Sequence, residues 1–206
     1  MALTACAGVV PSSGSSSRMG RDKGLLELEG RSFIRRTVDT LVKGGCEPVL
    51  LVVAEGEEAL AAEGAAAGAV VLLNPEPGDG PITSLRVALA ALDGSVDGVA
   101  YLPVDHPMVR AETVGLLLEA ARASSSFLTI PRFRGKRGHP AIFGEALFAE
   151  LLDPALQGGA KTVVHRHLAD ALLLDVEDSG VTIDVDTPGA YEAILDAVQA
   201  PAGGQE

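Results

Sequence analysis

The sequence predicts an α/β fold of one domain, in which a mostly parallel sheet carries helices on both faces. Apolar runs of strand length alternate with helical patterns along most of the chain. The runs are unbroken, as expected of strands that are covered on both faces. The length of 206 residues suits one domain, which we expect to span residues 1–200.

Five apolar runs predict the strands. The first is residues 3–10. The chain has no Lys or Arg before Arg18, so this run lacks the basic start of a secretory signal and is better explained as a strand. The other predicted strands are 49–53, 69–73, 99–102 and 127–130. No apolar run approaches the roughly 18 residues of a membrane span, so we expect no membrane as a partner.

Between the strands, apolar residues recur at the i, i+3, i+4, i+7 spacing of one helix face. This spacing predicts helices around residues 34–42, 85–92 and 114–121. A last helix is predicted to begin at Pro188, with Thr187 as its N-cap. Its buried stripe would consist of Tyr191, Ile194, Leu195 and Val198. We expect residues 201–206 to form a flexible tail.

The chain is acidic, with a net charge of −12. Such a surface repels nucleic-acid backbones, so we expect no nucleic acid as a partner, and any anionic ligand would need a local cluster of cations. Two such clusters occur: Arg18, Arg21 and Lys23, and a basic hairpin of Arg132, Arg134, Lys136 and Arg137. Taken alone, the hairpin is as consistent with a solvated face as with a ligand site.

The two cysteines, Cys6 and Cys46, give no sign of a disulfide framework. Their number and spacing therefore indicate a reducing compartment, and we expect a cytoplasmic protein.

The segment from Pro11 to Lys23 carries the strongest chemical signal. It follows the first strand and is rich in Gly and Ser, which let backbone N–H groups approach an anion closely. Arg18 and Lys23 add charge. The Lys lacks the flanking residues of a Walker A loop, and the dinucleotide fingerprint is absent. A flexible Ser-rich linker is the alternative, but a linker needs no Arg and Lys at this position.

Two acidic segments predict a metal site. Asp105 comes just after the strand at 99–102, and a carboxylate there is a good ligand for Mg²⁺. Asp184 and Asp186 would alternate along a strand end and face opposite sides, so we favour Asp186, beside the start of the last helix. The alternative for Asp105 and Asp186 is helix capping.

Two further segments are less specific. His139 lies in Gly138-His139-Pro140 after the basic hairpin and could orient a substrate, although an isolated His is more often structural. The segment from Asn74 to Ser84, with Gly80 within it, links a strand to a helix and could line a nucleotide site or form a surface turn. His165 and His167 are two residues apart in a predicted helix, so they do not form a metal pair.

Together these segments resemble the molybdenum cofactor nucleotidyltransferases, the MobA/MocA-like NTP transferases, over nearly the whole chain. The residues that match the opening pattern of that family are Gly14, Ser16, Arg18, Met19, Gly20 and Lys23. The segments around Asp105 and Asp186 match as well. The resemblance implies a Rossmann-like sheet of the nucleotide-diphospho-sugar transferase type. It also implies transfer of a nucleoside monophosphate to molybdopterin, with Mg²⁺ as cofactor and release of pyrophosphate.

Within the family, Gly138-His139-Pro140 and the segment from Gly80 to Ser84 are similar to the cytidylyltransferase branch. The guanylyltransferase branch tends to carry two adjacent Gly residues where this chain has Ser13 before Gly14. We therefore expect CTP rather than GTP. The alternatives are a guanylyltransferase, another NTP transferase with a sugar phosphate acceptor, and a non-catalytic protein that delivers the cofactor.

The resemblance also assigns roles to residues. The catalytic set is Arg18, Lys23 and Asp105, and Asp105 and Asp186 hold Mg²⁺. The nucleotide site is expected to comprise Ser12, Ser13, Gly14, Ser15, Arg18, Lys23, Asn74, Gly80 and Ser84. The acceptor is expected to meet His139, Arg132 and Arg134. A recipient molybdoenzyme, or its chaperone, is a further partner to consider.

Overall fold

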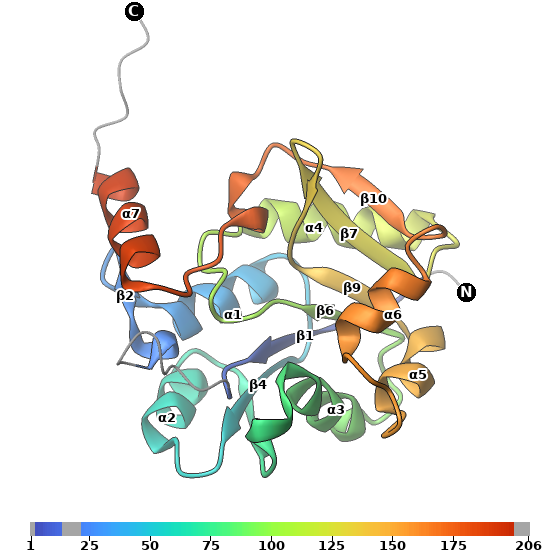
Figure 1. Ribbon diagram of the computed structural model, residues 1–206, viewed down its shortest axis with the longest axis horizontal. Coiled ribbons are helices and arrows are strands. Elements are labelled where there is room, and N and C mark those ends of the chain that lie inside the picture. Colours follow the sequence, from blue (N-terminus) through green and yellow to red (C-terminus); the bar gives the residue numbers. More distant parts are fainter. Residues whose placement is uncertain (1–2, 14–21, 200–206) are drawn as a thin grey trace, which may run out of the picture.

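The central sheet has eight strands in the part of the chain that the computed structural model describes, residues 3–13 and 22–199 (Figure 1). The strand order is β10-β7-β9-β6-β1-β4-β5, and β8 pairs with β7. The strands are β1 (Cys6–Pro11), β4 (Val49–Ala54), β5 (Val70–Asn74), β6 (Gly98–Tyr101), β7 (Leu128–Phe133), β8 (Lys136–Arg137), β9 (Ala141–Gly144) and β10 (Leu172–Asp175). A separate two-stranded sheet joins β2 (Glu27–Leu28) to β3 (Arg31–Ser32).

The sheet is mostly parallel, as predicted. Strand β1 lies at its centre and pairs in parallel with β4, where Gly8 faces Val49, and with β6, where Cys6 faces Gly98. The pairs β4–β5 and β7–β10 are also parallel, while β9 runs antiparallel to β6 and β7. The carboxyl ends of β1, β4 and β6 therefore meet at one edge.

Seven α-helices cover both faces of the sheet within the described residues. They are α1 (Phe33–Lys43), α2 (Glu58–Ala66), α3 (Pro81–Ala91), α4 (Ala111–Ala123), α5 (Phe148–Leu152), α6 (Ala160–Arg166) and α7 (Pro188–Gln199). One buried cluster joins the sheet to α1, α2, α4 and α7, and the other joins it to α3, α5 and α6. Strand β1 serves both clusters: Cys6 and Val10 belong to the first, and Ala7 and Val9 to the second. This explains the unbroken apolar runs.

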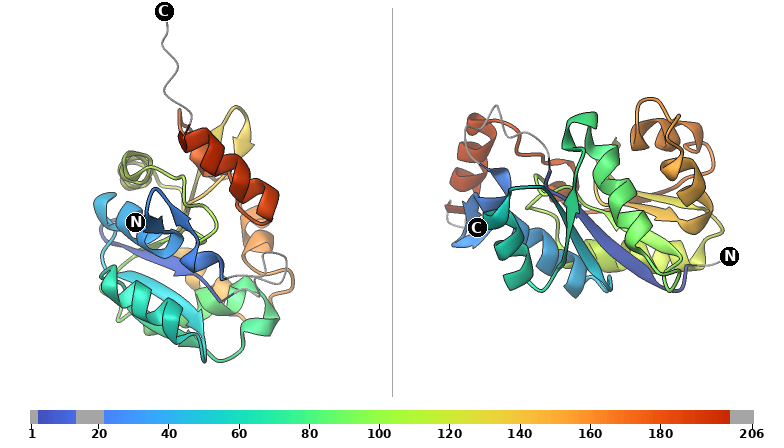
Figure 2. Two further views of the ribbon diagram at one scale, coloured as in Figure 1. Left: turned by 90° about the vertical axis from the view of Figure 1, so that its left-hand side faces the viewer. Right: turned by 90° about the horizontal axis from the view of Figure 1, so that it is seen from below.

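The last helix begins as predicted. The Thr187 hydroxyl accepts a hydrogen bond from the backbone N–H of Ala190 at 3.2 Å, which caps α7 at Pro188. Tyr191 of α7 packs edge-on against Phe33, and its hydroxyl donates to the Glu27 carbonyl. Helix α7 and the β2–β3 pair consequently lie together at one end of the molecule (Figure 2). The predicted tail, 201–206, lies outside the described residues.

Several boundaries differ from the prediction. Strand β1 begins at Cys6 rather than residue 3, and β7 continues to Phe133. Helix α6 ends at Arg166, so His165 is helical and His167 follows the helix. The strand expected around Asp184 and Asp186 is absent, since residues 183–186 are irregular after a short 3-10 helix, η4 (Ser179–Thr182). Within the described chain, no helix has both the length and the apolar character needed to cross a bilayer.

Candidate active site

The carboxyl ends of the parallel strands open into a cleft of about 1480 Å³. Its walls are the loop after β1, residues 103–106 after β6, the turn before β9 and the segment from Val181 to Asp186. The N–H of Val104 donates to the Pro11 carbonyl, which joins the first two walls, and the N–H of Ser12 donates to the Val52 carbonyl of β4 at 2.8 Å. The cleft lies where open parallel sheets bind ligands.

At the middle of the cleft, the structure brings Lys23, Asp105 and Asp186 together. The Lys23 ammonium forms an ion pair with Asp186 and lies 3.7 Å from Asp105 Oδ2. Lys23 begins a 3-10 turn, η1 (Lys23–Leu25). The three residues come from distant parts of the chain, and the sequence analysis predicted all three as functional.

The electrostatics of Asp105 suit a bound cation. Burial raises the pKa of Asp105 to about 6, Lys23 opposes that rise, and the neighbouring Asp186 adds to it. The Oδ1 atom of Asp105 is buried and has no hydrogen-bond partner among the described residues. A carboxylate pair with one orphaned oxygen fits Mg²⁺, which usually takes one or two carboxylates and completes its shell with water and substrate phosphates.

The position of Asp184 corrects the sequence prediction. Asp184 and Asp186 were expected to face opposite sides of a strand, but both line the cleft. The strand periodicity does not apply, because the segment is irregular and is held at Val185, whose N–H donates to the Asp105 carbonyl at 2.9 Å. Val185 itself is fully buried. Asp186 contacts Lys23, so the choice of Asp186 as the metal ligand stays a prediction.

The described residues that were predicted for the nucleotide site form two groups, those that line the cleft and those that do not. Ser12, Ser13 and Gly80 line the cleft, as does Lys23. Asn74 and Ser84 do not line it, since both are buried behind the loop after β1. In this structure they support the wall of the cleft, and their contact with the nucleotide stays a prediction. Gly14, Ser15 and Arg18 lie outside the described residues.

A buried network of hydroxyls explains where Asn74 and Ser84 lie. The Asn74 side-chain N–H₂ reaches Thr83 Oγ1 at 2.8 Å, Ser84 Oγ at 3.1 Å and Ser13 Oγ at 3.3 Å. Ser13 and Ser84 also share a hydrogen bond between their hydroxyls. The network ties the loop after β1 to the start of α3 and so sets the position of Ser13.

His106, which is buried, and His139, which is partly buried, form a ring pair in the cleft. Their ring centroids are 4.6 Å apart, and His139 Nδ1 lies 3.4 Å from the Tyr101 carbonyl oxygen. Burial lowers the pKa of His139, and burial together with His139 lowers the pKa of His106 to about 3. Both imidazoles are therefore neutral at pH 7. The sequence analysis predicted a role for His139 and missed His106.

Only two of the four cationic residues of the basic hairpin line the cleft. Arg132 makes two hydrogen bonds of 2.6 Å to Asp175 on β10, and the Arg134 guanidinium lies 5.1 Å from the centre of the Phe133 ring. Neither Arg132 nor Arg134 lines the cleft, whereas Lys136 and Arg137 do. The structure thus separates Arg132 and Arg134 from the other predicted acceptor residue, His139.

Two further cleft residues, Lys161 and His165 on α6, were also missed. They are four residues apart and so share one helix face. That spacing was visible in the sequence, but nothing local indicated that α6 would lie beside the cleft.

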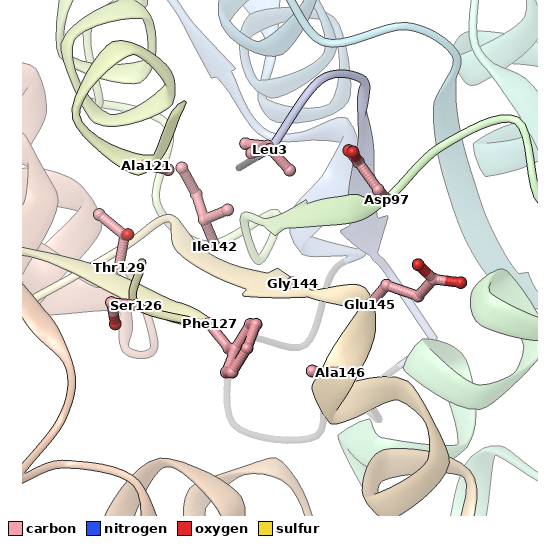
Figure 3. A pocket seen from close by; sticks show the side chains of 10 residues that line it. All are labelled: Leu3, Asp97, Ala121, Ser126, Phe127, Thr129, Ile142, Gly144, Glu145 and Ala146. Carbon is pink, nitrogen blue, oxygen red and sulfur yellow. The ribbon is translucent and has the colours of Figure 1, made fainter. Parts of the chain in front are cut away.

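A second hollow, of about 320 Å³, lies at the opposite end of the sheet (Figure 3). Leu3, Phe127 and Ile142 give it an apolar lining. Its carboxylate Asp97 accepts hydrogen bonds from the backbone N–H groups of Thr4 and Ala5 at 2.9 Å, which holds the start of β1. Asp97 and Glu145 are the two carboxylates of the hollow, and Asp97 is used in this structural contact (Figure 3).

Comparison with known proteins gives a family match. A family model described as the MobA-like NTP transferase domain matches residues 8–171. The nicotine blue oxidoreductase of Paenarthrobacter nicotinovorans is 28% identical over 193 residues, which cover 90% of this chain and 94% of that protein. A probable molybdenum cofactor guanylyltransferase of Opitutus terrae is 36% identical over 121 residues, 58% of this chain and 57% of that protein.

The fold has solved counterparts. The crystal structure of Rv0371c from Mycobacterium tuberculosis H37Rv aligns with a TM-score of 0.79 and 29% identity, over 94% of this chain and 99% of that one. A structure of Rv0371c in complex with manganese aligns with a TM-score of 0.77 and 27% identity, over 94% of this chain and all of that one.

Proposed function

This chain belongs to the family of MobA-like NTP transferase domains, and we propose that it transfers CMP from CTP to the terminal phosphate of a molybdopterin-type acceptor. The observation that carries the proposal is the cluster of Lys23, Asp105 and Asp186 at the middle of the cleft. Two carboxylates and one ammonium at the carboxyl end of a parallel sheet suit a nucleoside triphosphate with its cation. The free, buried Cys6 and Cys46 support a cytoplasmic location.

The proposed reaction is an in-line displacement. An oxygen of the acceptor phosphate attacks the α-phosphorus, a new P–O bond forms, and pyrophosphate leaves with the electrons of the broken P–O bond. The nucleophile is already anionic, so the protein needs no strong base, and positioning and charge neutralisation supply most of the catalysis.

Each part of the site has a place in this reaction. Lys23 would stabilise the negative charge of the triphosphate, and we expect Arg18 to act with it. Asp105 and Asp186 would hold Mg²⁺, which when bound neutralises phosphate charge. The buried Ser13–Ser84–Asn74 network would hold Ser13 in one position beside the nucleotide.

The preference for CTP is supported by the position of Ser13. Its hydroxyl is tied to Ser84 and Asn74, so Ser13 is anchored where the guanylyltransferase branch tends to have a second Gly. A fixed Ser side chain at this position leaves less room for a purine. Steric selection of this kind contributes about 1–3 kcal/mol, so we expect some use of GTP.

Pyrophosphate release from purified protein tests the proposal. CTP or GTP would be supplied with Mg²⁺ and either molybdopterin or a sugar phosphate. We expect release with CTP and molybdopterin, at a higher kcat/KM than with GTP. Faster turnover with GTP would make the chain a guanylyltransferase, and turnover only with a sugar phosphate would contradict the acceptor. No release with any pair would favour a delivery protein.

A further inference from the structure

We propose that Lys161 and His165, on one face of helix α6, hold the phosphate of the acceptor that attacks the nucleotide. This inference rests on the proposed function and deepens it, because it names the residues that bring the second substrate to the reaction. Three features of α6 carry it: the pairing of its basic residues, its packing, and its direction from Lys23.

The basic residues at α6 differ in their partners. Arg166 and His167 both contact Glu150, through Nη1 at 2.6 Å and through Nε2 at 2.7 Å. Lys161 and His165 are exposed and line the cleft instead, and neither has a carboxylate partner in the described part of the chain. The chain has 28 acidic residues and only 16 Lys and Arg. Basic residues that line a cleft unpaired in so acidic a chain indicate an anionic ligand.

The backbone of α6 is held firmly beside the cleft. Val163 is fully buried in the second core cluster. Before the helix, Gly159 has a φ of 63°, and a Cβ there would lie 3.3 Å from Ile82 Cβ in the first turn of α3. The Thr162 hydroxyl also donates to the Gln157 carbonyl at 2.8 Å. The helix face next to Val163 is therefore fixed at the wall of the cleft.

Helix α6 and Lys23 approach the cleft from different ends of the molecule. Lys23 precedes β2 and Asp186 precedes α7, and these elements lie together at one end (Figure 2). Helix α6 lies toward the other end, beside α5 (Figure 1). In an in-line displacement, the nucleophile and the leaving group lie on opposite sides of the α-phosphorus. With the leaving pyrophosphate at Lys23, the acceptor phosphate arrives from the direction of α6.

The two side chains suit a phosphate. The Lys161 ammonium supplies a charge and the His165 ring an N–H donor, and their spacing of four residues places them on one helix face, where they can contact the same group. An attacking phosphate oxygen loses negative charge as the new P–O bond forms. The α6 residues therefore bind the acceptor before the reaction, and their loss raises the acceptor KM more than it lowers kcat.

Inorganic phosphate tests the anion site without the acceptor. The chain has four His residues, so their ring C–H signals in the NMR spectrum are few, and a His165→Gln variant identifies the signal of His165. At fixed pH, we expect phosphate to shift this signal in a saturable manner. Lys161→Gln should weaken the apparent affinity about fivefold, as for one exposed charge pair, and Lys161→Arg should preserve it. Arg166→Gln is the matched control, because it removes one charge from the same helix on the side of Glu150.

Steady-state kinetics then assigns the site to one substrate. We expect Lys161→Gln to raise the acceptor KM about fivefold, while kcat and the KM for CTP hardly change. Lys161→Arg should restore most of the loss, and Arg166→Gln should leave both KM values as in wild type. The substituted side chain of Lys161 is exposed, so its variants should keep the Tm of the wild type.

The opposite results would overturn the inference. A His165 signal that does not respond to phosphate, or equal weakening by Lys161→Gln and Arg166→Gln, would make this face of α6 a solvated surface. A rise in the KM for CTP as large as that for the acceptor would assign the site to the nucleotide. Phosphate binding that depends on Lys161, in a protein that releases no pyrophosphate with any substrate pair, would overturn the proposed function and leave the anion site standing.

Discussion

The basic hairpin gives a prediction whose control residue lies in the same hairpin. Lys136 and Arg137 line the cleft and are exposed, whereas Arg132 of the same hairpin is paired with Asp175 and does not line it. Replacing Lys136 and Arg137 together by Ser should weaken capture of the anionic acceptor. Replacing Arg132 by Ser should leave the acceptor KM unchanged.

The size of the effect follows from exposure. Exposed charge pairs contribute about 0.2–1 kcal/mol each, so the loss of two should raise the acceptor KM roughly two- to thirtyfold at low salt. The effect should shrink as salt rises, because the Debye length falls to about 8 Å at physiological ionic strength. Since the residues predicted for the nucleotide, Ser12, Ser13 and Gly80, lie on other walls of the cleft, the KM for CTP should hardly change.

Steady-state kinetics would decide this. The acceptor is varied at fixed CTP, then CTP at fixed acceptor, each at low and high salt, for wild type, the double variant and Arg132→Ser. An unchanged acceptor KM in the double variant at low salt would refute the reasoning. So would an equal rise in Arg132→Ser, because the effect would then follow the charge of the hairpin and not its position.

Three further outcomes are expected. Asn74→Ala removes up to two donated hydrogen bonds, so the free energy of unfolding should fall by roughly 2–3 kcal/mol and Tm by about 4–12 °C, and an unchanged melting curve would contradict the network. Ser13→Gly should raise the kcat/KM for GTP relative to CTP, up to about a hundredfold; a constant ratio would remove Ser13 from nucleotide selection. Burial raises the pKa of Asp97, but hydrogen bonds from Thr4 and Ala5 outweigh it and lower the pKa. Asp97 therefore stabilises the fold above its unfolded pKa of about 3.9, and this contribution disappears as pH falls through the lowered folded value, so Asp97→Asn should lower Tm at pH 7 and converge with wild type in acid. A Tm difference that stays constant with pH would exclude that account.

Local pattern was enough to predict the strands that are buried on both faces. The run at 49–53 is unbroken because alternate residues serve two cores: Leu51 belongs to one cluster and Val52 to the other. Helix α2 was missed because its Ala and Glu residues give no apolar stripe, and it buries only Leu60 and Gly64. Strands β9 and β10, of four residues each, were also missed.

The site was predictable where chemistry and position along the chain coincide. Lys23, Asp105 and Asp186 each follow or precede a regular element, so each could be assigned to the edge of the sheet. The orientation of Asp184 could not be predicted, since it depends on the hydrogen bond between Val185 and Asp105. Likewise, the pairing of Arg132 with Asp175 depends on the register of β7 against β10.

His106 is the clearest example of a cleft residue whose placement depends on contacts that are distant in sequence. Its position beside Asp105 was visible in the sequence, but its burial and its contact with His139 arise from the antiparallel pairing of β9 with β6. No local pattern encodes that pairing. A cleft residue that is placed by strand pairing is therefore harder to predict than one that directly follows a strand along the chain.

The central claim, that Asp105 holds the cation of a nucleotidyl-transfer site, is tested most directly by the turnover of Asp105→Asn. Asp184→Asn is the matched control, because its carboxylate lines the same cleft but makes no ion pair with Lys23 in the described structure. We expect pyrophosphate release by Asp105→Asn to fall by about a hundredfold or more, with an intact fold by circular dichroism, while Asp184→Asn stays within about tenfold of wild type. Near-normal release by a folded Asp105→Asn protein would contradict the claim.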